Sequence, residues 1–199
     1  MRIPFSTPSP WQHIDNVNWA ADYPYAPLTA FRAWHDGDNF YIEFKVEEET
    51  TKAEQNVPGD PVYMDSCVEC FIQPNPGDPH YYNLEWNAAG HMEMGWRTGR
   101  NDAEKAPLSV LESIKTFPSL GSEPFGEKAI PGPWTLKVAI PAAALFKSGL
   151  KSWNGLECRM NFYKCGDGLK KMHFLSWSPV LTPAPDHHTP QFFAPVIFD

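Results

Sequence analysis

The stretch LTAFRAWHDGDNFYIEFKVEEE, residues 28–49, decides the fold class of this chain. Residues 28–35 and 39–47 are rich in aromatic and β-branched side chains, and the sequence Asp36-Gly37-Asp38 separates them. Two such segments around a short glycine-containing turn predict a β-hairpin. Apolar and polar residues alternate within 39–47, which predicts one buried and one solvent-facing side for the second strand.

Further apolar runs follow along the chain, with proline and glycine between them. We expect strands in DSCVECFIQP (65–74), HYYNLEWNAAGHMEMGWR (80–97, a hairpin turning at 87–90), SVLESIKTF (109–117), WTLKVAIP (134–141, leading into a short helical turn), GLECRMNFYKC (155–165) and KMHFLSWSP (171–179). Residues 51–64, 101–108 and 119–133 are predicted to be loops. This pattern predicts an all-β chain, an antiparallel β-sandwich of the immunoglobulin-like or jelly-roll-like kind with at most short helical turns. At 199 residues we expect a single domain, 1–199.

Composition narrows the possible partners. The formal net charge of -8 argues against a nucleic acid or an anionic membrane surface. No segment approaches the ~20 apolar residues of a membrane span. The opening MRIPFSTPSPWQH has no apolar stretch of the signal-peptide kind, so we expect a cytoplasmic protein or a mature form whose leader has been removed. The aromatic fraction of 14% suits a packed sheet core, and it also suits a carbohydrate site, where sugar C–H faces lie against aromatic rings.

The four cysteines do not form an obvious metal motif. Cys67 and Cys70 lie three residues apart on one expected strand, so their side chains should point to opposite faces. Cys158 and Cys165 bracket another strand. A zinc site needs converging thiolates, which usually come from turns. We therefore favour reduced, buried thiols over zinc.

Alternation in four of the expected strands leaves a polar face opposite the apolar one. The side chains predicted to share this polar face are Glu69, Asn83, Glu85, Glu93, Arg97 and Asn161. An ordinary solvated face is one interpretation, because antiparallel sheets commonly have one. Carboxylates, amides and a guanidinium with few lysines also suit hydrogen bonds to the vicinal hydroxyls of a sugar.

Four segments carry a resemblance to a known family: DSCVECFI (65–72), YYNLEWNAAG (81–90), NFYKCGD (161–167) and LSWSPV…PDHHTPQFFAPVIF (175–198). They resemble the family 9 carbohydrate-binding modules, especially the stand-alone branch common in gut and soil bacteria. The resemblance extends from about residue 28 to the end of the chain. It implies a non-catalytic β-sandwich used in carbohydrate catabolism and polysaccharide degradation. Such a module clamps a pyranose ring between two aromatic side chains and hydrogen-bonds its hydroxyls from the sheet face.

The resemblance assigns roles to individual positions. The first clamp position falls on Tyr63, where better-known members have tryptophan, and the glutamate that contacts sugar hydroxyls falls on Glu69. Asn83 occupies the position of an arginine in those members, so an amide replaces a guanidinium group in that contact here. The second clamp position falls on His187, where tryptophan or phenylalanine is expected. Together with the polar face, the predicted ligand-binding set is Tyr63, Glu69, Asn83, Glu85, Arg97, Asn161 and His187.

The neighbouring His188 is expected to make structural hydrogen bonds that hold its loop, although both histidines could also be loop residues of no consequence. A metal site at these histidines would need a third ligand such as His173 or His80. No cofactor is expected to be required. The resemblance also allows structural calcium, for which Asp65 and Asp186 are too generic to assign.

Two other functions remain open from the sequence. Glu69 and Glu85 could be the paired carboxylates of a glycoside hydrolase, about 5–10 Å apart. A haem-binding sandwich could use Met92, Met94 and His91. For sugar binding we expect dissociation constants of roughly µM to mM, because a shallow site for one or two rings gains only ~4–8 kcal/mol.

Overall fold

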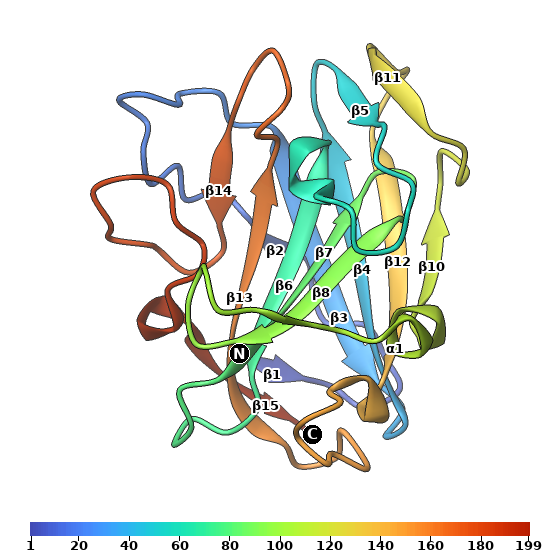
Figure 1. Ribbon diagram of the computed structural model, residues 1–199, viewed down its shortest axis with the longest axis vertical. Helices are drawn as coiled ribbons and strands as arrows, with labels where there is room; N and C mark the ends of the chain where they lie inside the picture. The colour runs from blue at the N-terminus through green and yellow to red at the C-terminus, as the bar shows by residue number, and fades with distance from the viewer.

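The computed structural model describes residues 1–199, which form two β-sheets packed face to face (Figure 1). The eight-stranded sheet has the order β1 (Arg2–Ile3), β15 (Ala194–Phe198), β13 (Glu157–Cys165), β6 (Cys67–Gln73), β7 (Tyr81–Asn87), β8 (Met92–Arg97) and β9 (Glu104–Lys105), and β14 (Phe174–Ser176) also pairs with β13. The five-stranded sheet has the order β10 (Lys115–Pro118), β12 (Trp134–Pro141), β4 (Asn39–Glu47), β3 (Leu28–His35) and β2 (Gln12–His13). A small sheet joins β5 (Thr51–Ala53) to β11 (Phe125–Lys128).

The predicted β-sandwich and its first hairpin are confirmed. Strands β3 and β4 pair antiparallel from Leu28–Glu47 to His35–Phe40, with the predicted turn between them. All other ladders are antiparallel except the one between β1 and β15, which is parallel. The chain therefore begins beside the strand with which it ends.

The main core lies between the two sheets and contains 35 buried residues. It includes the apolar side chains predicted for β6, β7, β8 and β13, such as Val68, Leu84, Met94 and Phe162. Trp86 is fully buried there. The two-residue alternation therefore identified the inner face of the larger sheet correctly.

The outer face of the larger sheet is not a solvated face. A second cluster of ten buried residues lies on it, with Phe71, Tyr81 and Tyr163 near its centre. Every residue of β6 and of β7 is buried as a result. Loops cover this face, and the segment between β8 and α1 crosses in front of the sheet (Figure 1).

Strands β14 and β15 pair with the same edge of β13, and the connection between them covers the outer face of the sheet. β15 pairs with the first half of β13, and β14 pairs with the last three residues of the same strand. Residues 177–193 connect these two strands, so they leave the sheet at its edge and fold over its outer face. The predicted strand over 171–179 was therefore too long, because only Phe174–Ser176 pair.

Four further predictions of secondary structure were wrong in part. The predicted loop at 101–108 contains the short strand β9, which pairs with β8. The segment 109–117 contains the helix α1 (Leu108–Ser113) before the short strand β10, and Val110, Leu111 and Ile114 have helical rather than alternating spacing. The predicted loops at 51–64 and 119–133 contain the paired strands β5 and β11. The other helices are the single turns η1 (Val62–Met64), η2 (Ala142–Ala144) and η3 (Pro190–Phe192).

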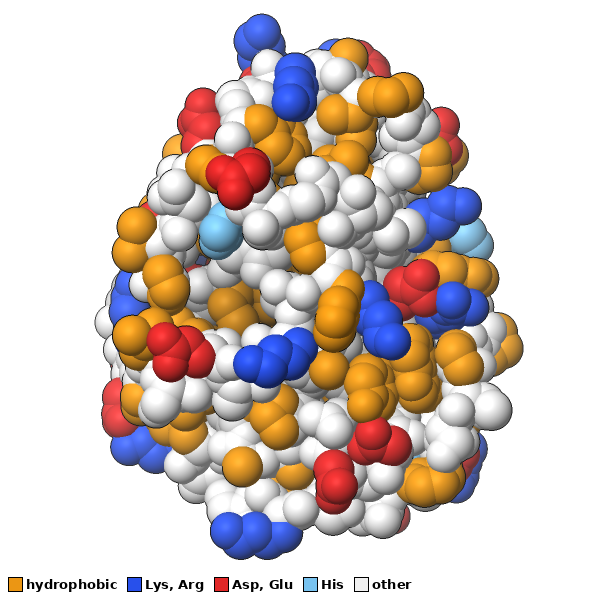
Figure 2. Space-filling model, turned by 90° about the vertical axis from the view of Figure 1, so that its right-hand side faces the viewer, with side chains coloured by type: hydrophobic (Ala, Val, Ile, Leu, Met, Phe, Trp, Pro, Cys, Tyr) orange, Lys and Arg blue, Asp and Glu red, His pale blue; other side chains and the backbone are white.

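None of these helices has the length and apolar character that crossing a membrane requires. Figure 2 shows the side of the molecule that carries α1, β10 and β11. Acidic and basic side chains are scattered among hydrophobic ones there, so neither sign of charge dominates this side.

Candidate functional site

A cavity of about 390 Å³ opens on the outer face of the larger sheet. Its volume falls within the roughly 300–1,000 Å³ of typical ligand sites. The residues that line it are Tyr63, Glu69, Glu85, Glu93, Arg97, Arg100, Asn101, Cys165, Asp167, Phe174, Pro185, Asp186, His187 and His188. The lining is unusually polar for a pocket, with five carboxyl groups and two guanidinium groups.

Three glutamates form a row across the floor of this cavity. Glu69 of β6 lies directly opposite Glu85 of β7, and Glu85 lies directly opposite Glu93 of β8. Neighbouring strands are about 4.8 Å apart, so the three carboxyl groups are close together. All three are buried, and like charges opposite each other destabilise a sheet. Such an arrangement is typical of functional sites, where stability is sacrificed for chemistry.

Burial and mutual repulsion change how these carboxyl groups titrate. Burial, reinforced by Glu69 and Glu93, raises the pKa of Glu85 well above its usual range. Burial also raises the pKa of Glu93, although Lys105 and Arg97 oppose this shift. A carboxyl group that keeps its proton can both donate and accept a hydrogen bond, which matches the dual character of a hydroxyl ligand.

Tyr63 forms an aromatic wall of the cavity. It lies in the short helix η1 and is 40% exposed, so one face of its ring is available to a ligand. The backbone holds η1 tightly against the β13–β14 turn, because Asp167 donates its N–H to the Tyr63 carbonyl at 3.1 Å. A side chain at Gly168 would approach the Met64 carbonyl to 2.5 Å, so this close contact requires glycine.

His187 also lines the cavity, but it is not a free-standing wall. Its ring stacks on Tyr163 with 4.1 Å between centroids, and the residue is only 7% exposed. Its Nδ1 lies 3.1 Å from Glu69 Oε2. The clamp of His187 opposite Tyr63 stays a prediction, and it would use the face of the imidazole that Tyr163 does not cover.

The loop that carries His187 is held down by its neighbours. His188 Nδ1 lies 3.0 Å from the Tyr81 hydroxyl, which confirms the structural hydrogen bond expected of this residue. Arg100, from the segment after β8, donates to the Pro185 carbonyl at 2.9 Å and to Asp186 Oδ1 at 3.1 Å. Two loops far apart in sequence thus meet at the rim of the cavity.

Asn83 and Asn161 belong to the polar face but do not line the cavity. Asn83 donates to Glu85 Oε1 at 2.9 Å, and Gly95 opposite it leaves the room that its side chain needs. Asn161 donates to the Ser178 carbonyl at 3.0 Å and accepts the Ser178 N–H at 2.8 Å. The structure places them as supports of Glu85 and of the 177–193 loop, and it gives neither a direct place against a ligand.

The sequence matches carbohydrate-binding family 9 over residues 6–198. The chain belongs to this family. Family 9 modules bind carbohydrate without cleaving it, and their β-sandwich is the fold described above.

Among solved structures, a Bacteroides uniformis protein with a proposed carbohydrate-binding role is 39% identical, with a TM-score of 0.91 over 95% of this chain and 86% of its own. A family 9 module from Caldicellulosiruptor kristjanssonii in complex with cellotriose is 12% identical, with a TM-score of 0.61 over 100% of this chain and 92% of its own. A family 9 module from the same organism in complex with glucose is 13% identical, with a TM-score of 0.58 over 100% and 96%. No curated protein matches the chain in sequence.

Besides Glu93 and His188, seven residues line the cavity that were not in the ligand-binding set predicted from the sequence. These are Arg100, Asn101, Cys165, Asp167, Phe174, Pro185 and Asp186. Most come from loops, whose path over the sheet has no periodic signal in the sequence. Asp167 had one available signal, because it is the last residue of the family segment 161–167 and lies in the turn directly after β13.

The residues proposed for haem binding and for a metal at the loop histidines do not converge, whereas Glu69 and Glu85, the pair proposed for a glycosidase, are directly opposite each other. Met92 and Met94 are buried in the main core, and His91 Nε2 lies 3.0 Å from the Ser122 carbonyl. The rings of His80 and Trp96 stack with 3.8 Å between centroids, and His173 Nε2 lies 2.8 Å from Lys164 Nζ. Neither histidine therefore joins His187 as a metal ligand. The haem alternative is not favoured in this family 9 chain.

Proposed function

We propose that the cavity on the outer face binds the end of a saccharide, with the carboxyl row as its floor. The observation that carries this proposal is the row itself, because three buried carboxyl groups offer a dense array of acceptors, and donors where they are protonated. Membership of carbohydrate-binding family 9 supports the class of ligand.

Each lining group has a role in this proposal. The exposed face of Tyr63 packs against the C–H face of a sugar ring, as aromatic side chains do with flat apolar surfaces. Glu85 and Glu93 hydrogen-bond to hydroxyl groups. Arg97 donates to the Arg100 carbonyl at 3.0 Å, and its buried Nε has no partner in the chain, so it can donate to a sugar oxygen.

The charge of the lining favours a neutral sugar over an acidic one. Five carboxyl groups face two guanidinium groups, so the carboxylate of a uronic acid would meet like charge. The two Caldicellulosiruptor modules are complexes with glucose and cellotriose, which are both neutral. We propose a neutral hexose or short oligosaccharide as the ligand.

Binding without cleavage is part of the proposal. A retaining glycosidase needs a free carboxylate nucleophile. Both oxygens of Glu69 are engaged, Oε1 by the Cys165 thiol at 2.9 Å and Oε2 by His187. Incubation with a panel of aryl glycosides should therefore release no phenol above the buffer rate, and turnover that Glu85→Gln abolishes would contradict this part of the proposal.

Isothermal titration calorimetry tests the ligand. The panel is cellobiose, xylobiose, galactose, glucosamine and glucuronic acid, each with and without EDTA. We expect enthalpy-driven binding of a neutral sugar and no heat with glucuronic acid. If the double variant Tyr63→Ala, Glu85→Gln bound the sugar as tightly as the parent chain does, the sugar would bind outside this cavity.

A further inference from the structure

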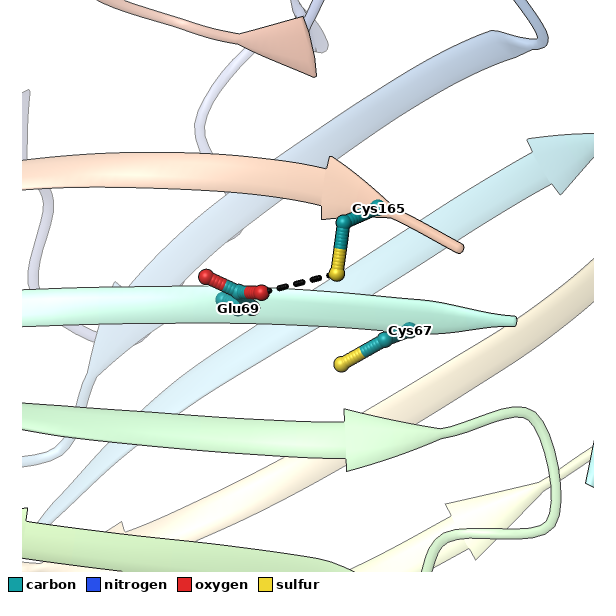
Figure 3. Close-up of side chains that lie close together, drawn as sticks. All are labelled: Cys67, Glu69 and Cys165. Atoms are coloured by element: carbon teal, nitrogen blue, oxygen red, sulfur yellow. Dashed lines mark hydrogen bonds between the residues drawn. The ribbon is translucent and has the colours of Figure 1, made fainter. Parts of the chain in front are cut away.

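Two thiols and a carboxylate meet where β13 lies beside β6 (Figure 3), and two of these three groups, those of Glu69 and Cys165, line the cavity. Cys67 and Cys165 are directly opposite in the antiparallel ladder, and Glu69 follows Cys67 by two residues on the same face. The donor atoms of all three side chains lie within 4.8 Å of one another. Because the two cysteines are far apart in sequence, no motif predicts their convergence.

This cluster is buried, and its Glu69 is paired at 3.1 Å with His187 rather than with a lysine or arginine. Glu69 is 3% exposed, and no lysine or arginine lies within ion-pair distance of Glu69, of the neighbouring Glu85 or of Asp167. Buried carboxylates are normally paired with a cation or coordinate a metal. The Glu69 oxygen on the Cys165 side is therefore not held by a lysine or arginine and is available to a metal ion.

We infer that Cys67, Cys165 and Glu69 bind a divalent metal ion of the zinc type. Two sulfur donors select against calcium and magnesium, which require oxygen ligands, whereas zinc accepts sulfur and carboxylate together. Coordination replaces the two thiol protons, so one metal ion enters and two protons leave.

The fourth coordination position faces the cavity, since Cys165 and Glu69 both line it. Three protein ligands with one open position are typical of zinc sites that exchange a ligand. A water molecule or a hydroxyl group of a bound molecule would complete the tetrahedron.

His187 supplies an independent observation in favour of this site. Its Nδ1 lies 3.1 Å from Glu69 Oε2, which leaves Oε1, the oxygen beside Cys165 Sγ, to face the metal. Stacking on Tyr163 fixes the imidazole plane. A hydrogen bond to the outer oxygen of a ligating carboxylate is the arrangement by which proteins orient metal ligands. His187 Nε2 is buried, lines the cavity and has no partner in the chain, so a polar ligand there would also satisfy it.

Cobalt(II) titration of the reduced full-length chain tests the site without any sugar. We expect one cobalt per chain, an intense tetrahedral visible spectrum and a sulfur-to-cobalt charge-transfer band in the near ultraviolet. Zinc should displace the cobalt, because it binds such sites more tightly. The sugar proposal is tested separately by calorimetry, so either proposal can fail while the other stands.

The chain offers matched controls, because two of its four buried cysteines lie outside the cluster. Cys67→Ala and Cys165→Ala should each lose the charge-transfer band and about 100-fold or more in affinity, and His187→Ala about tenfold, the size of outer-shell effects. Cys70→Ala, on β6 but on its opposite face, and Cys158→Ala should bind cobalt as the parent does.

Zinc X-ray absorption on the parent chain does not depend on how the variants fold. Two sulfur scatterers at about 2.3 Å are expected. A shell of nitrogen and oxygen alone, a cobalt spectrum without charge transfer, or equal losses in Cys70→Ala and Cys165→Ala would overturn the proposal. A Cys67–Cys165 disulfide that persists in reductant, found by mass spectrometry, would overturn it as well.

Discussion

Tyr63 is the most exposed aromatic residue at the cavity. His187, the other residue predicted for the clamp, is less exposed because Tyr163 stacks on one face of its ring. We therefore expect Tyr63 to supply the larger part of the aromatic contact with a sugar.

Replacing Tyr63 with alanine should weaken sugar binding about fivefold to tenfold, since an aromatic contact contributes roughly 1 kcal/mol. Calorimetry with the best ligand of the panel measures this. Phe117→Ala is the control, because Phe117 is an exposed aromatic residue on β10 in the other sheet. Equal affinity of Tyr63→Ala and the parent would contradict the proposed wall.

Glu85 lies between two other carboxyl groups, so a neutral amide should relieve repulsion across the strands. We expect Glu85→Gln to raise the free energy of unfolding at pH 7 by about 0.5–1 kcal/mol in urea denaturation. Glu43→Gln is the comparison, since Glu43 pairs with Arg32 at 2.6 Å and its replacement should not stabilise the chain. A loss of stability in Glu85→Gln would mean that the repulsion is already compensated.

At the scale of elements, the loop 177–193 builds one side of the site and Asn161 holds its start. This asparagine reaches the loop from the middle of β13, through two hydrogen bonds with the backbone of Ser178. Its contribution to binding is therefore indirect.

Asn161→Ala should cost about 1–2 kcal/mol of stability, because it leaves partly buried backbone groups of Ser178 without partners. Sugar affinity should fall although no lining residue changes. Hydrogen exchange should rise at residues 178–189 and stay unchanged in β3 and β4. Asn154→Ala, at an exposed turn, should behave as the parent in both measurements.

Strand positions could be predicted from the sequence far better than the site. Alternation placed Glu69, Glu85 and Arg97 on one face, because side-chain direction in a strand has a period of two. It could not show that loops bury this face, since their paths depend on tertiary contacts such as Arg100 with Asp186. The meeting of Cys67 with Cys165 depends on strand order and register, which periodicity does not contain.

At the scale of the whole molecule, one end of the sandwich contains buried charge. Lys164 Nζ is fully buried and lies 3.0 Å from Glu48 Oε2 and 2.8 Å from His173 Nε2. His173 Nδ1 lies 2.8 Å from the Lys171 carbonyl, and Tyr25 contacts the ring edge-on. Burial and the charge of Lys164 lower the pKa of His173 to about 2.

This histidine should make stability depend on pH. Below its usual pKa near 6.5, the unfolded chain protonates His173 while the folded chain does not. The unfolded state then binds more protons, so the free energy of unfolding falls as pH falls from about 6.5, by at most about 1.4 kcal/mol per pH unit. Burial lowers the pKa of His188 to about 2, so it acts in the same direction, whereas the raised pKa values of Glu85 and Glu93 act in the opposite one.

His173→Gln isolates this contribution, because an amide can donate to Lys171 and accept from Lys164. Urea unfolding at pH 7, 6 and 5 should show a shallower loss of stability in the variant than in the parent. Parallel curves would show that His173 does not titrate differently in the two states.

The shared edge of β13 has a consequence for how such a domain can change. Residues 177–193 begin and end on strands that pair with β13 independently of the loop. The loop sequence can therefore be exchanged while the strands of the sandwich stay the same. A graft between relatives that keeps Asn161 and Ser178 could exchange one rim of the site while leaving the carboxyl floor in place. New specificity would then require no change in the architecture of the sandwich.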